Sequence, residues 1–175
     1  MLHNNLAIAY LSIPAVDESG KMREALAVQS FEEVLKVINL VDHPSEYAMI
    51  QNNLGNALQY AASGHALENN LRALAAYDEA LKVRTRRDTP VEYANTLANK
   101  ANVLRHLAAQ DDADAHGGNP QAQAHALYRQ AKALFEQHGL HDRAELVAGA
   151  MAELQAEGVN GRAPQGPPDL EPEHS

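Results

Sequence analysis

The chain has 175 residues, which is enough for one domain with a hydrophobic core and little more. Its formal net charge of −9 excludes nucleic acid and an anionic membrane surface as expected partners, because both are negatively charged. Disulfides and thiolate metal sites are excluded because there is no cysteine, and the absence of a signal peptide or a ~18-residue apolar run predicts a cytoplasmic protein. Abundant alanine and an aromatic fraction of only 5% favour closely packed helices over strands, so we expect an all-α fold.

Helix start and stop signals divide the chain into seven segments. Proline occurs at a predicted helix start at Pro44, Pro90 and Pro120, where its missing N–H costs nothing. Glycine provides stop signals at Gly64, Gly117-Gly118 and Gly139. The predicted helices cover residues 2–12, 21–40, 45–62, 68–87, 91–109, 120–138 and 141–157.

The first of these helices begins almost at Met1 and has no lead-in like that of the later ones. Either the domain begins abruptly or the chain is a fragment of a longer protein. Without a preceding helix, its apolar side chains would favour a partner or self-association into a homo-oligomer. The alternative is that the helix is fully packed on the helix that follows it. The side chains concerned are those of Leu2, Leu6, Ile8 and Leu11.

Several segments of the sequence recur after 46 residues. The Pro, Glu, Tyr and Ala of residues 43–48 reappear in residues 89–94, and residues 31–37 reappear in residues 77–83. By the same shift, Asn53 corresponds to Asn99 and Asn56 to Asn102. Fainter echoes extend the pattern in both directions, so one unit occurs about three times.

The recurring residues resemble the tetratricopeptide repeat (TPR). That pattern has Leu-Gly in its first helix, as in Leu54-Gly55, and Ala-x3-aromatic-x2-Ala in its second. The second-helix pattern occurs three times, as Ala27/Phe31/Val34, Ala73/Tyr77/Ala80 and Ala124/Tyr128/Ala131. The resemblance implies a right-handed superhelix of stacked antiparallel helix pairs with about three repeats. The units would cover residues 1–43, 44–89 and 90–140, followed by a capping helix at 141–157.

The unit departs from the standard pattern in length and in one helix. A standard TPR has about 34 residues, and the longer unit is similar to a long-repeat variant common in bacterial proteins. We assign the extra residues to the link between Gly55 and Ala73 and to a second helix about one turn longer. In the third unit, Lys100-Ala101 replaces Leu54-Gly55.

The two ends of the C-terminal region differ in character. Residues 141–157 place Ala144, Val147, Met151 and Leu154 at spacings of three and four, which predicts an apolar stripe that covers the end of the stack. Residues 158–175 contain four prolines and three glycines with few apolar residues, so we expect a disordered tail.

A binding groove is expected on the concave side, which the first helix of each unit would line. The residues two before and two after Leu54, and those one turn away, would face it. The predicted groove residues are Asn4, Ile8, Met49, Asn52, Asn56, Gln59, Tyr60, Asn95, Asn102, Arg105 and His106. Asparagine amides can donate and accept, so such a wall can hold the backbone of an extended segment. The alternative is that some of these asparagines satisfy backbone groups between helices and bind nothing.

The TPR resemblance also bears on the kind of ligand. In TPR domains that bind peptide C-termini, an Asn directly after the Gly holds the carboxylate; Asn56 and Asn102 match that place, whereas Ile8 does not. Arg105 is the only cation placed in the groove. A general groove for an extended peptide is therefore favoured over a carboxylate clamp.

Other patterns in the sequence support no chemistry. His138 and His141 are separated by Gly139, so a metal pair is not favoured, and the Asp112-x-Asp114 loop lacks calcium ligands at the later positions. The basic run at Lys82, Arg84, Arg86 and Arg87 is interpreted as the end of a long helix. There is no nucleophile with a base, no phosphate loop and no paired carboxylate motif, so we expect neither an enzyme nor a cofactor nor a metal.

The sequence therefore predicts a protein–protein interaction module, an adaptor, scaffold or assembly factor. Its partner would be another protein, bound through a peptide or helix segment in the concave groove. The alternative is a structural or self-associating fragment of a larger solenoid, with no peptide ligand of its own.

Overall fold

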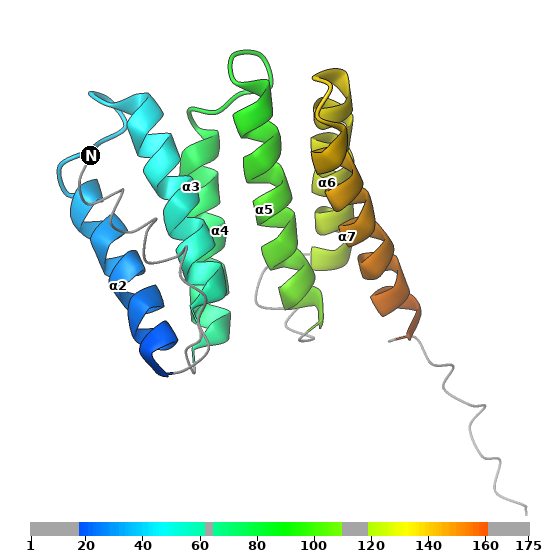
Figure 1. Cartoon of the computed structure of the whole chain (residues 1–175), viewed down its shortest axis with the longest axis horizontal. Coiled ribbons are helices and arrows are strands. Elements are labelled where there is room, and N and C mark those ends of the chain that lie inside the picture. The colour runs from blue at the N-terminus through cyan, green and yellow to red at the C-terminus, as the bar shows by residue number, and fades with distance from the viewer. Residues whose placement is uncertain (1–17, 62–64, 110–118, 161–175) are drawn as a thin grey trace, which may run out of the picture.

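The computed structural model of the protein describes residues 18–61, 65–109 and 119–160 (Figure 1). These residues form six α-helices and no strand, which confirms the all-α class for this part of the chain. The predicted helix at 2–12, with its proposed self-association surface, lies outside the described residues. Among the described helices none is long and apolar enough to span a membrane. The helices are α2 (Glu18–Leu35), α3 (Pro44–Tyr60), α4 (Ala66–Leu81), α5 (Pro90–Ala109), α6 (Pro120–Gln137) and α7 (His141–Asn160).

The helices form two layers. Each described helix packs against the next one in the chain, and in addition α3 contacts α5 and α5 contacts α7. In Figure 1, α3, α5 and α7 lie in the front layer, with α4 behind α3 and α6 behind α7. From α3 onward the chain therefore alternates between the layers, and the front layer is built from the helices that begin at Pro44, Pro90 and His141.

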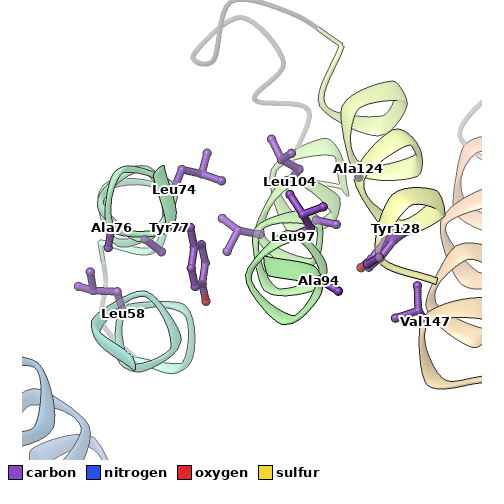
Figure 2. Close-up of a cluster of buried hydrophobic side chains, with 14 of the residues drawn as sticks. Leu58, Leu74, Ala76, Tyr77, Ala94, Leu97, Leu104, Ala124, Tyr128 and Val147 are labelled. Carbon is purple, nitrogen blue, oxygen red and sulfur yellow. The ribbon is translucent and has the colours of Figure 1, made fainter. Parts of the chain in front are cut away.

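The core is formed by small and aromatic residues at corresponding positions of α2, α4 and α6. Phe31, Tyr77 and Tyr128 are all buried, and the alanines four residues before each of them are fully buried as well. In Figure 2, the Tyr77 ring lies between the helices that carry Leu58, Leu74 and Leu97. Because alanine has no side chain beyond Cβ, the helices approach closely and the aromatic rings fill the remaining space. The recurring residues are thus core residues.

Gly55 is required by the Tyr77 ring. A Cβ atom at position 55 would lie 2.5 Å from Tyr77 Cε1, closer than two carbon atoms can pack. We expect Gly55→Ala to lower the free energy of unfolding by about 1–2 kcal/mol, because overpacking outweighs the gain in helix propensity. Chemical denaturation of both proteins would measure the change.

Gly149 in α7 provides a matched control for this substitution. No atom lies within 4 Å of a Cβ built there, so Gly149→Ala is expected to raise the free energy of unfolding by about 0.5–1 kcal/mol. Equal effects at the two positions would show that the contact between Gly55 and Tyr77 has no energetic role.

Two helices end earlier than the sequence predicted, and both ends have the same cause. α2 ends at Leu35 rather than residue 40, and α4 ends at Leu81 rather than residue 87. After α2, Asn39 Oδ1 accepts hydrogen bonds from the backbone N–H groups of Val41 and Asp42. These bonds favour a turn over further helix.

The loop after α4 is built in the same way, 46 residues later. Thr85 Oγ1 accepts a hydrogen bond from the backbone N–H of Asp88 at 3.0 Å and donates to its carboxylate at 2.8 Å. The expectation of a longer second helix was therefore wrong, because the additional residues before Pro90 form a turn held by side chains. The basic run does not close the helix either: Lys82 is the C-cap residue and the three arginines follow it.

The connection between α6 and α7 is short and confirms the predicted stop. Gly139 has a φ of 72°, a left-handed conformation that glycine adopts without strain. The predicted apolar stripe of α7 packs inward, with Ala144, Val147 and Leu154 buried. α7 extends to Asn160, so residues 158–160 are helical rather than part of the expected tail. Residues 161–175 lie outside the described part of the chain.

Candidate binding groove

The structure distributes the predicted groove residues over two helices of the front layer. Asn4 and Ile8 lie outside the described residues. The others are on α3 and α5, which contact each other, and they do not all share one surface. On α3 are Met49, Asn52, Asn56, Gln59 and Tyr60, and on α5 are Asn95, Asn102, Arg105 and His106.

A cavity of about 320 Å³ lies between α5 and α7, with α6 residues behind it. It brings together Asn95 and Asn102 from the predicted set with Asn99 of the same helix. In Figure 2, Tyr128 lies between α5 and the helix that carries Val147. The other lining residues are mostly apolar: Ala98, Tyr128, Phe135, Arg143, Leu146, Val147 and Ala150.

Two of the predicted asparagines hold tyrosine hydroxyls. Tyr77 donates to Asn56 Oδ1 at 2.8 Å, and Tyr128 donates to Asn102 Oδ1 at 2.5 Å. Each bond joins a front-layer helix to the second-layer helix that follows it. The bond is therefore the same in two successive helix pairs, and it anchors a side-chain hydroxyl rather than a backbone group.

The two tyrosines remain donors at any physiological pH. Burial raises the pKa of Tyr128 to about 12 and raises the pKa of Tyr77 still further above its ordinary value. In this geometry the oxygen of each asparagine faces the hydroxyl and accepts from it, so each NH2 group is directed away from the tyrosine. On this geometry Asn102 can offer a ligand in the cavity a donor, whereas its oxygen is already engaged.

Asn52 contacts polar residues of the neighbouring front-layer helix, α5. It is 8% exposed, and its Oδ1 lies 3.1 Å from Thr96 Oγ1 and 3.4 Å from Asn99 Nδ2, both on α5. Thr96 in turn accepts a hydrogen bond from Arg84 Nη1 at 2.8 Å. Asn52 therefore connects α3 to α5 in a polar network.

The side of the cavity formed by α7 was not predicted from the sequence. From the sequence, that helix was expected only to act as a cap at the end of the stack. Arg143 donates to Asn95 Oδ1 at 3.0 Å, and its guanidinium carbon lies 6.0 Å from the centre of the Phe135 ring. Leu146 lines the cavity yet is 75% exposed. Arg105, the one cation expected in the groove, forms an ion pair with Glu153 of α7 at 2.6 Å. An apolar stripe at spacings of three and four shows which face of a helix is buried. It does not show what the residues beside that face contact.

The remaining predicted residues lie elsewhere. Gln59 and His106 line a second cavity, of about 260 Å³, where the ends of α3 and α5 meet the start of α4. Met49 and Tyr60 are exposed on α3, Tyr60 at 64%. The described residues of the predicted set are therefore divided between the α5–α7 cavity, the second cavity and the surface of α3, while Asn52, Asn56 and Arg105 are used in contacts between helices.

The weaker patterns gain no support in the described part of the chain. No group of three or more His, Asp or Glu side chains there is arranged to hold a metal ion. Asp112 and Asp114 are outside the described residues. In the basic run, Lys82 pairs with Glu79, and burial lowers the pKa of Arg84, which is turned toward α5.

Comparisons with protein-family models, with curated proteins and with solved structures gave no significant match.

Proposed function

We propose that this protein is a protein–protein interaction module of the TPR type, a superhelix of helix pairs that binds a segment of a partner protein. The observation that carries the proposal is the cavity between α5 and α7, which combines amide groups, a guanidinium and exposed apolar surface. Interfaces and peptide sites commonly join an apolar centre to a few directed polar groups.

The polar side of this cavity suits a peptide backbone. Asn99 and Asn102 contribute amide groups from one helix, and Arg143 contributes a cation held by Asn95. The N–H and C=O groups of a peptide backbone need hydrogen-bond partners when they are removed from water. An asparagine side chain can donate to the C=O or accept from the N–H. Recognition of this kind does not depend on the ligand's side chains.

The apolar side of the cavity suits one anchoring side chain. Leu146 stands largely exposed beside Val147 and Ala150, so a bound apolar side chain would remove this surface from water. Arg143 is the one cation among the described lining residues, and Arg105 is paired with Glu153 instead of lining the cavity, so an extended segment that binds mainly through its backbone fits better than a clamp with several cations. The module needs no catalytic group, cofactor or metal for this role, and an adaptor, scaffold or assembly factor in the cytoplasm fits it.

The groove is tested by a substitution in its exposed apolar wall. Peptides selected from a random displayed library against the full chain would be synthesised and titrated by fluorescence polarisation. We expect Leu146→Glu to weaken their binding at least tenfold, because it places a charge where the anchor would be buried. Its exposure means that the fold should tolerate the change.

Ala152→Glu is the matched control, since Ala152 is an exposed residue of the same helix that does not line the cavity. It should leave binding unchanged. Failure to select any peptide, or equal affinity for Leu146→Glu and the unaltered protein, would contradict the proposed groove.

A further inference from the structure

The second cavity lies at the opposite end of the front layer from the Pro44 and Pro90 helix starts. Its volume is about 260 Å³, and it is lined by the last residues of α3, the first two turns of α4 and the C-terminal part of α5. A water molecule occupies about 30 Å³ of liquid, so the space can hold a group as large as an amino-acid side chain. Its described lining residues are Leu58, Gln59, Ala61, Ala66, Asn69, Asn70 and His106.

Asn70 is the unusual member of this lining. It is only 5% exposed, and among the described residues its carboxamide has no hydrogen-bond partner. A buried amide without a partner costs about 1–3 kcal/mol, so such groups are rare unless something occupies the space in front of them. Any group that fills the space in front of Asn70 must therefore both accept and donate hydrogen bonds if it is to satisfy the whole carboxamide.

In α6, the residue that corresponds to Asn70 has a hydrogen-bond partner. Gln121 stands in α6 where Asn70 stands in α4, three residues before the core alanine of the second helix. Gln121 Nε2 donates to the backbone oxygen of Leu154 in α7 at 3.2 Å. Asn70 is one methylene shorter and faces a cavity instead of reaching the neighbouring helix.

The other polar groups of the cavity are uncharged at neutral pH. Burial, and secondarily the nearby Arg105, lower the pKa of His106, so its imidazole offers one donor and one acceptor. Gln59 Oε1 lies 3.4 Å from the Tyr77 hydroxyl, whose hydrogen Asn56 accepts at 2.8 Å, so the Gln59 amide can offer both a donor and an acceptor. No ionised side chain is found among the described lining residues.

We propose that this cavity is a binding site for a primary carboxamide. A carboxamide presents an oxygen and an NH2 group side by side, so it can pair with Asn70 through two parallel hydrogen bonds. An anion or a cation would be buried without a counter-ion, and an apolar group would leave Asn70 unsatisfied. The carboxamide can belong to a free small molecule such as glutamine or to an Asn or Gln side chain of a partner protein.

The test uses the ¹⁵N-labelled full chain and minimal probes. Propionamide, which carries only the proposed group, is expected to shift the Asn70 side-chain NH2 signals in a saturable way, with millimolar affinity. Propionate has the same shape but carries a charge, and it should bind at least tenfold more weakly. Two further titrations, with L-glutamine and with N-acetylglutamine methylamide, identify the source: the tighter ligand indicates a free amino acid or a partner side chain, respectively.

Variants of the chain locate the site. Asn70→Leu keeps the branching and the number of side-chain heavy atoms and removes a buried unpaired amide, so it should fold and should lose propionamide binding at least tenfold. Gln130→Leu, which replaces an exposed amide of α6, is the control and should bind normally. Equal binding of propionamide and propionate, no saturable shift at Asn70, or undiminished binding to Asn70→Leu would each overturn the proposal. Should Asn70→Leu fail to fold, the comparison of the two probes decides alone.

This inference does not rest on the proposed peptide groove. Leu146 is not among the lining residues, so Leu146→Glu should leave propionamide binding unchanged. Loss of one kind of binding can therefore be distinguished from loss of the other.

Discussion

Replacing Tyr77 with alanine is expected to lower the free energy of unfolding by about 3–5 kcal/mol, the largest effect of any substitution considered for this protein. The ring is fully buried and lies against Gly55, so its removal leaves a space that neighbouring alanines cannot fill. The variant also loses the hydroxyl that Asn56 accepts. Urea denaturation followed by circular dichroism would measure the change.

Two further variants separate the contributions at this position. Tyr77→Phe retains the ring and leaves the Asn56 oxygen without its donor, which should cost about 1 kcal/mol. Tyr60→Ala removes an exposed tyrosine of α3 and should change stability by no more than about 0.5 kcal/mol. If Tyr77→Ala were no more destabilising than Tyr60→Ala, the described core would be wrong.

Substitution of Thr96 by valine should have the next largest effect, a loss of about 1–3 kcal/mol. Thr96 is fully buried, and its hydroxyl accepts from Arg84 at 2.8 Å. It also lies 2.9 Å from the backbone oxygen of Glu92 and 3.1 Å from Asn52 Oδ1, one of which receives its hydrogen. Valine has the same shape without the hydroxyl, so a half-buried guanidinium would lose its acceptor.

A double-mutant cycle tests the origin of that loss. In an Arg84→Met background no cation remains to be satisfied, so Thr96→Val should cost at least about 0.5 kcal/mol less than in the unaltered chain. Thr96→Ser keeps the hydroxyl and should retain most of the stability. Additive effects of Arg84→Met and Thr96→Val would show that the contact contributes nothing to stability.

The helices were predictable because their signals are local. Pro44, Pro90 and Pro120 mark helix starts by their lack of an N–H, and Gly139 marks a stop by its left-handed backbone. The buried positions were predictable as well, because a core aromatic recurs at a fixed distance from a core alanine.

The ends of α2 and α4 were not predictable from the same signals. The residues after Leu35 and Leu81 have ordinary helix propensity, and what ends each helix is a side chain several residues on. Asn39 and Thr85 differ chemically, so the sequence does not show that both hold the same turn. Such a turn competes with the helix through hydrogen bonds from side chain to backbone, which helix propensity does not record.

The candidate site was predictable only in part. Periodicity places Asn95 and Asn102 on one face of a helix, and both line the cavity between α5 and α7. It could not show that Asn52 would meet Thr96, or that Asn56 and Asn102 would accept from tyrosines, because these partners lie far away in the chain. Arg143 and Leu146 were missed because the helix that carries them was assigned one role when it has two.

That double role of α7 makes docking of the last described helix and occupancy of the cavity thermodynamically linked. A ligand that contacts both α5 and α7 would stabilise the docking of α7 against α5. By linkage, docking of α7 would favour ligand binding by the same coupling free energy. Amide protons of α7 that exchange through local detachment should then slow in proportion to the free ligand concentration, while those of α3 would be unaffected.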